Sequence, residues 1–226
     1  MLPDHEAGSV DLYWIPLGAG HHSVRCNGIV YEALHATIER RARCDLYHSV
    51  LAIDLEPDRF WVEMTPVPDG HGDWRGVVAE GPVGVRAFGR LRLFRYEIRR
   101  WRDGVVPDLA YAVASPIRLT DDAVVARRVF DVLPRVPTLV WGRDERATGD
   151  MWSCNSVISW TLSTAGIDVA GIPLPPRARA PGWHAGVALA ERSGGQSCCD
   201  SLQASSSSPM RSSPARSGSH RSGAAT

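Results

Sequence analysis

The sequence contains no lysine, since all 25 basic residues are arginine, and 25 acidic residues balance them to a formal net charge of zero. A balanced charge gives no reason to expect nucleic acid or an anionic membrane as a partner. No apolar run reaches the roughly 18 residues that a membrane-spanning helix needs. The first residues include acidic side chains and lack the apolar segment of a signal peptide. We therefore expect a cytoplasmic protein without an integral membrane segment.

Cysteine pairs at metal-binding spacing are also lacking. The cysteines are Cys26, Cys44, Cys154, Cys198 and Cys199, and no two of them form a CxxC motif. This spacing predicts free thiols in a reducing compartment rather than a disulfide framework or a zinc site. The histidines between residues 21 and 48 match no zinc-binding pattern either. We therefore predict no metal. We also predict no cofactor, since the thiol chemistry considered below needs none.

What the sequence has is the composition of one globular domain, with 44% hydrophobic and 22% charged residues. That composition changes at Ser193, after which the chain is rich in serine and offers little apolar surface to bury. Such a segment cannot offset the entropy cost of ordering. We expect a domain over residues 8–192 and a disordered tail over 193–226. A native tail and a frameshifted end would have the same composition, and both interpretations stay open.

Hydrophobic periodicity and turn residues predict the elements of the domain. We expect strands over 10–15, 46–55, 59–66, 77–84, 90–98 and 186–190, and helices over 28–42, 120–133 and 154–165. Thr120 and Ser153 are the expected N-caps of the two later helices. Because strands and helices do not alternate regularly, the order favours an α+β fold, with an antiparallel sheet packed against helices.

Cys154 is the first candidate for chemistry, because it stands at the expected start of a helix. The N-terminus of a helix supplies partial positive charge and unpaired N–H groups. These groups stabilise a thiolate and also the oxyanion that forms when a thiolate attacks an acyl group. A catalytic Cys154 fits this position. The alternative is a buried thiol that only fills space.

His48 and Glu63 are the candidate partners of Cys154. His48 lies in the expected strand LYHSVLAI, where a histidine can take a thiol proton near neutral pH. If Glu56 and Pro57 form the turn, Val50 pairs with Glu63, and His48 is its diagonal neighbour at roughly 7–8 Å. Glu63 would then orient the imidazole. A shift of the strand register by one residue would move Glu63 to the other face of the sheet. The alternative interpretation is that Glu63 is a solvent-exposed strand residue without a catalytic role.

Three short motifs resemble the NlpC-type papain-like hydrolases. YHSVLAI is similar to the strand of that family that bears the histidine, CNSVI is similar to the start of its cysteine helix, and WVEMTP is similar to a short strand with a third polar residue. The histidine here precedes the cysteine, as in the circularly permuted branch that includes lecithin–retinol acyltransferase. The resemblance covers residues 44–66 and 150–166. It departs from the family pattern at Asn155, Ser49 and Leu51.

The resemblance implies a papain-like fold and a cysteine hydrolase or acyltransferase. Cys154 would attack an amide, peptide or ester bond and form a thioester, while His48 would move the proton and Glu63 would be the third polar residue. A small-molecule, peptide or lipid acyl group would be the substrate, with no nucleic acid partner. The alternative function is a catalytically inactive relative of the same fold that acts as a binding module.

Overall fold

The computed structural model of the chain describes residues 7–17, 44–67 and 76–206. The helix predicted over 28–42 lies outside these residues. The described part has the α+β architecture that the order of elements predicted. No helix within it is long and apolar enough to cross a membrane.

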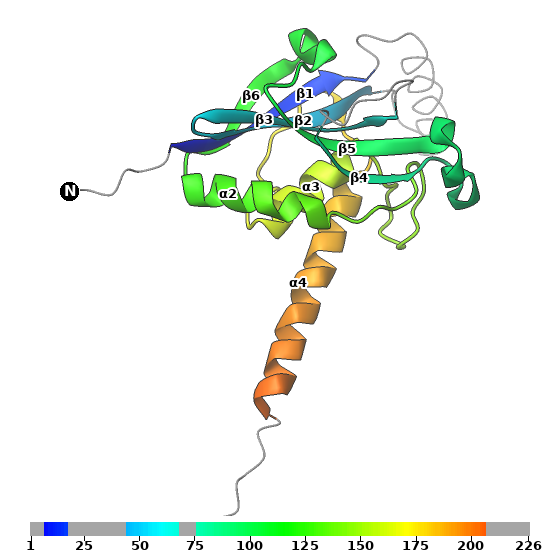
Figure 1. Cartoon of the computed structure of the whole chain (residues 1–226), viewed down its shortest axis with the longest axis vertical. Coiled ribbons are helices and arrows are strands. Elements are labelled where there is room, and N and C mark those ends of the chain that lie inside the picture. Colours follow the sequence, from blue (N-terminus) through cyan, green and yellow to red (C-terminus); the bar gives the residue numbers. More distant parts are fainter. Residues whose placement is uncertain (1–6, 18–43, 68–75, 207–226) are drawn as a thin grey trace, which may run out of the picture.

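A twisted sheet forms one layer of the fold (Figure 1). Its strands are β1 (Gly8–Pro16), β2 (Asp45–Leu55), β3 (Asp58–Pro66), β4 (Val77–Pro82), β5 (Arg95–Arg102), β6 (Val113–Thr120) and β7 (Ala178–Arg179). The order across the sheet is β4-β5-β3-β2-β1-β6, and these neighbours are antiparallel. The two-residue β7 runs parallel to the start of β2. The sheet is therefore antiparallel apart from this short strand, as the sequence predicted.

Three helices make up the second layer of the described part. They are α2 (Ala123–Val132), α3 (Cys154–Thr164) and α4 (Trp183–Ser206). Figure 1 shows all three on the same side of the sheet, with α2 and α3 against it and the start of α4 beside α3. Most buried apolar side chains of β1, β2 and β3 point toward these helices and form the main core with them. This face of the sheet is called the helix face below.

The other face of the sheet is called the His48 face. Its apolar side chains form a second, smaller cluster, which includes Ile15, Val50, Trp61 and Trp101. Short 3-10 turns connect the strands, and one of them, η4 (Pro107–Tyr111), follows Val106 of this cluster. Because strand side chains alternate between faces, the helix face takes alternate residues of β2 and the His48 face takes the residues between them.

The hairpin of β2 and β3 has the register that its turn residues predicted. Leu55 pairs with Asp58 and Leu51 with Val62, so Glu56 and Pro57 are the two turn residues. The pairs of the two strands end there, and one further step of the same register would place Val50 opposite Glu63. Trp61, two residues before Glu63 in β3, belongs to the small cluster. Since paired residues share a face, Glu63 lies on the His48 face, as the expected register required.

Several predicted elements are corrected by the structure. Asp122, not Thr120, caps α2: its carboxylate accepts hydrogen bonds from the backbone N–H groups of Val124 and Val125, while Thr120 accepts one from the N–H of Asp122. Residues 86–94, expected in part as strand, form two 3-10 turns before β5. The sequence also gave no prediction for β6. Its first four residues, Val113–Pro116, do not alternate in polarity, and the four alternating residues that follow lead directly into the predicted helix.

The segment GVALA, predicted as a strand over 186–190, lies inside α4. Its five residues are too few to distinguish a strand from one and a half turns of a helix. Packing against α3 decides for the helix, because Gly186 allows close contact with Ser159. The same helix continues to Ser206, past Ser193, where the sequence predicted the tail to begin. Residues 207–226 lie outside the described residues.

We predict that Gly186→Ala destabilises the fold although alanine favours helices. A Cβ at this position would collide with Ser159 Oγ and with the Ser156 carbonyl, so α3 and α4 would have to separate. We expect the free energy of unfolding to fall by about 1–3 kcal/mol, measured by urea denaturation. Gly194→Ala in the same helix meets nothing within 4 Å. This control should leave stability unchanged or raise it by up to about 1 kcal/mol, and equal losses in both variants would contradict the packing argument.

Candidate functional site

The start of α3 is a fully formed capping box. Ser153 Oγ accepts a hydrogen bond from the N–H of Asn155 at 3.1 Å, and Ser156 Oγ accepts one from the N–H of Ser153 at 2.9 Å. Ser153 is therefore the N-cap that the sequence predicted, and Cys154 is the first residue of the helix. The helix ends before Gly166, whose φ of 88° is one that glycine adopts without strain.

The Cys154 thiol lies inside the core at this helix terminus. Only 7% of the residue is exposed. Burial raises the pKa of Cys154 to about 11, while the N–H groups of Asn155, Ser49 and Cys154 itself act to lower it. The sulfur is thus surrounded by N–H donors, as a nucleophile would require, yet the thiol is protonated near neutral pH because desolvation outweighs those donors.

Asn155, the residue after Cys154, anchors the helix to the sheet. Its Oδ1 accepts a hydrogen bond from Ser49 Oγ at 2.9 Å, and its Nδ2 donates to the carbonyls of Tyr47 and Pro181 at 3.0 and 2.9 Å. Both partners in β2 are odd-numbered residues whose side chains lie on the helix face. The sequence showed Asn155 only as a departure from a family motif, so its structural role was missed. The one sequence signal that could have found it is its position in the first turn of the helix, two residues after the N-cap Ser153.

His48 lies between those two residues and therefore points away from α3. The register of β1 and β2 is continuous and pairs His48 with Ile15, which belongs to the small cluster on the His48 face. Burial lowers the pKa of His48 to about 4, and the nearby carboxylate of Asp108 acts in the opposite direction. The imidazole is therefore neutral near pH 7 and held on the side of the sheet opposite to the helices.

Glu63 shares the His48 face and takes part in a buried ionic group. Arg99 NH1 donates to Glu63 Oε1 at 3.1 Å, and Arg99 Nε donates to Glu97 Oε1. All three residues are less than 10% exposed. Burial raises the pKa of Glu63, against the lowering effect of Arg99. One guanidinium thus stands between two carboxylates, with Asp108 also near enough to affect both Glu63 and His48.

The structure therefore brings two of the three predicted site residues to one face and leaves the third on the other. Glu63 and His48 both belong to the His48 face, whereas Cys154 packs in the main core on the helix face. Among the described residues no hydrogen bond joins His48 to Cys154. Nor do these residues include a group of three or more histidine, cysteine, aspartate or glutamate side chains able to hold a metal ion.

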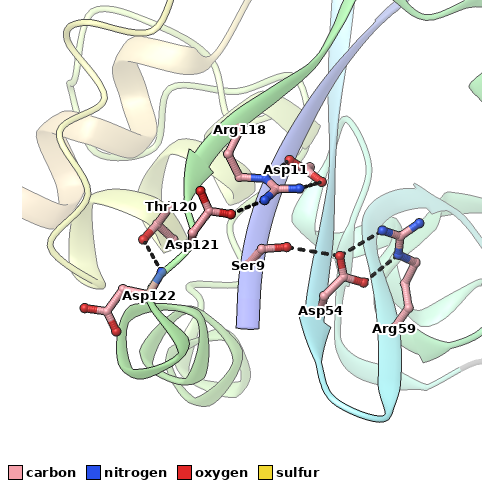
Figure 2. Close-up of polar contacts among 8 residues, drawn as sticks. All are labelled: Ser9, Asp11, Asp54, Arg59, Arg118, Thr120, Asp121 and Asp122. Atoms are coloured by element: carbon pink, nitrogen blue, oxygen red, sulfur yellow. Dashed lines mark hydrogen bonds and ion pairs between the residues drawn. The ribbon is translucent and has the colours of Figure 1, made fainter. Parts of the chain in front are cut away.

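A second polar group occupies the end of the sheet near the β2–β3 turn (Figure 2). Arg59 forms a two-point ion pair with Asp54 at 2.6 and 2.8 Å, and Ser9 donates to the same carboxylate. Arg118 of β6 pairs with Asp11 of β1 at 2.6 Å and reaches Asp121 as well. All of these residues except Asp11 border a hollow of about 590 Å³. The two arginines and the three aspartates all have partners within the group, so its contacts fasten β1, β2 and β6 together.

Comparison of the chain with protein-family models, with curated proteins and with solved structures found no match. The resemblance to the permuted NlpC-type family therefore stays a prediction that rests on the three short motifs.

We predict that His48 makes the fold less stable in acid. Its pKa of about 4 lies below the ordinary histidine value of 6.5, so the unfolded chain binds a proton that the folded chain excludes between these pH values. Stability from this residue is complete above about pH 6.5 and falls by up to about 3 kcal/mol as the pH approaches 4.

His48→Gln should reduce the loss of stability between pH 7 and pH 4, measured by urea denaturation at each pH. His184 is an exposed histidine of α4, and His184→Gln is the matched control. A loss in His48→Gln as large as in the unsubstituted chain would mean that His48 is accessible to protons in the folded state.

Proposed function

We propose that this chain is a non-catalytic binding module that takes its ligand on the His48 face. The observation that supports this proposal is the alternation of side chains along β2. Ser49 contacts α3 through Asn155, so His48, the adjacent residue, projects from the opposite face. A thiol–imidazole pair requires heavy atoms within hydrogen-bond reach, or joined by one water molecule.

The protonation state of Cys154 also supports a binding module. A pKa of about 11 leaves Cys154 as a neutral thiol, and a residue that is only 7% exposed offers a reactant little access. A cysteine nucleophile is normally partly exposed and has a lowered pKa. Cys154 instead has the surroundings of a cysteine that fills space in a core.

The His48 face also indicates the chemical class of the ligand. Arg99 contacts both Glu63 and Glu97, and Asp108 lies near Glu63. Three carboxylates therefore gather in this largely buried region of the face. Aromatic rings on the same face already hold cations, since the Arg99 guanidinium lies 5.2 Å from the centre of the Trp101 ring. A small ligand with a positive charge and an aromatic group would satisfy both features.

A cysteine hydrolase or acyltransferase is the second candidate. The observation in its favour is the set of N–H groups around the Cys154 sulfur at the capped start of α3. In this alternative the fold is of the papain-like, permuted NlpC type, and an acyl substrate displaces the side chains that bury the thiol. His48 would then have to reach Cys154 around the edge of β2, beyond Leu51 and Val62, where the pairing of β2 with β3 ends.

Thiol labelling separates the two candidates. We expect Cys154 in the folded chain to react with iodoacetamide at about pH 6.5 at least about tenfold more slowly than the same residue in the guanidinium-unfolded chain, because burial keeps it protonated. Peptide mass spectrometry after timed quenching gives the rate for each cysteine. Faster labelling of Cys154 than of the half-buried Cys44 in the folded chain would favour the hydrolase.

Ligand charge tests the binding proposal directly. We expect benzylamine to raise the melting temperature of the chain, and benzyl alcohol, its uncharged counterpart, to leave it unchanged, because the carboxylate of Glu63 pairs with the ammonium group. Glu63→Gln should lose this difference when each variant is compared with its own ligand-free value. Glu191→Gln, at an exposed residue of α4, should retain it. Equal shifts with both compounds, or no shift with either, would contradict the proposal.

A further inference from the structure

The connection between β4 and β5 exposes an unusual amount of apolar surface. The exposed fractions are 41% for Val85, 51% for Phe88, 57% for Leu91, 82% for Leu93 and 37% for Phe94. These residues belong to or adjoin two short 3-10 turns in which no residue is buried. Residues 85–94 are called the β4–β5 tip below. Figure 1 shows the short helical turns of the tip beyond the ends of β4 and β5, at one end of the sheet.

The tip has a defined apolar centre. The rings of Phe88 and Phe94 lie 5.5 Å apart, so the two turns fold onto each other through this contact. Leu91 joins the two turns, because it is the C-cap residue of the first turn and the N-cap residue of the second. An isolated exposed leucine needs no explanation, but a group of neighbouring large apolar side chains on a projecting segment indicates an interaction surface.

Positive charge surrounds this apolar centre. The tip contains three arginines, and a fourth follows it directly: Arg86, Arg90, Arg92 and Arg95. Residues 81–96 contain no acidic side chain. Glu145 pairs with Arg86, and Glu80 pairs with Arg95. The ten residues of the tip therefore include three arginines and no acidic residue, and Arg86 is paired with a glutamate from outside the tip, although the chain as a whole has a net charge of zero. The overall charge balance, which gave no reason to expect an anionic partner, conceals this local excess.

We propose that the β4–β5 tip binds the surface of an anionic lipid bilayer. Its phenylalanine and leucine side chains would enter the boundary between headgroups and acyl chains, and its arginines would contact lipid phosphates. Exposed apolar side chains interspersed with arginine are the pattern of segments that lie in this interface. Each basic residue near such a surface adds to binding through the negative surface potential.

A bilayer fits the tip better than a protein partner does. Stable protein interfaces bury roughly 800 Å² on each partner, over about 20–30 residues. The tip is a ten-residue segment beyond the ends of β4 and β5 (Figure 1) that exposes large apolar side chains, and a fluid lipid surface accepts such a segment without a matching groove. The interspersed arginines complement a continuous layer of phosphate groups and do not require individual acidic partners at fixed positions.

Flotation with lipid vesicles tests the proposal on the full chain. We expect binding to vesicles that contain phosphatidylserine and at least about tenfold weaker binding to vesicles of phosphatidylcholine alone, with a loss at high salt. The double variant Phe88→Ser, Leu93→Ser should lose binding to both. Arg90→Gln with Arg92→Gln should lose the preference for phosphatidylserine.

Matched controls keep the test specific. Val105→Ser changes another exposed valine, at 72% exposure, and Arg127→Gln with Arg128→Gln removes two exposed arginines of α2. Both controls should bind as the unsubstituted chain does. If the chain binds neither kind of vesicle, or if the tip variants bind as the unsubstituted chain does, the proposal is overturned. A dimer in analytical ultracentrifugation that Leu93→Ser dissociates, without vesicle binding, would assign the tip to a second copy instead.

Discussion

Three hydrogen bonds of one buried amide fix the relation between the two layers of this fold. Asn155 bonds to Ser49, to the Tyr47 carbonyl and to the Pro181 carbonyl, and so joins the start of α3 to β2 and to the segment before α4. The residue is only 2% exposed, and a buried amide left without partners costs about 1–3 kcal/mol. The arrangement in which all three hydrogen bonds of Asn155 are made therefore determines which residues of β2 face the helices.

The direction of His48 follows from that contact. A strand alternates its side chains, and the register of β1 with β2 has no bulge to interrupt the alternation. With Ser49 against α3, His48 has to point to the opposite face. The residue types of a thiol–imidazole pair are present in the sequence, but a shift of one position along β2 separates their directions. This separation is the reason that we propose a binding module and not a cysteine hydrolase.

The His48 face and the β4–β5 tip each hold side chains whose presence the packing of the core does not explain. The face gathers buried charges around Arg99, where burial alters the pKa values of Glu63 and His48. The tip places arginines beside exposed phenylalanine and leucine. We propose a small cationic ligand for the first region and an anionic lipid surface for the second. Since they come from different elements, each proposal can fail without the other.

Local patterns in the sequence determined the hairpin, its two-residue turn, the cap at Ser153 and the α+β order of elements, because turn residues and caps act over a few positions. They did not determine the helix at 186–190, the 3-10 turns at 86–94, or the cap at Asp122. In those segments short apolar runs or neighbouring polar residues permit more than one structure. The sequence named Cys154, His48 and Glu63 from residue type and position in an element. Only tertiary structure decided that Glu63 and His48 share a face and that Cys154 does not, because the face of a strand depends on what packs against its neighbour.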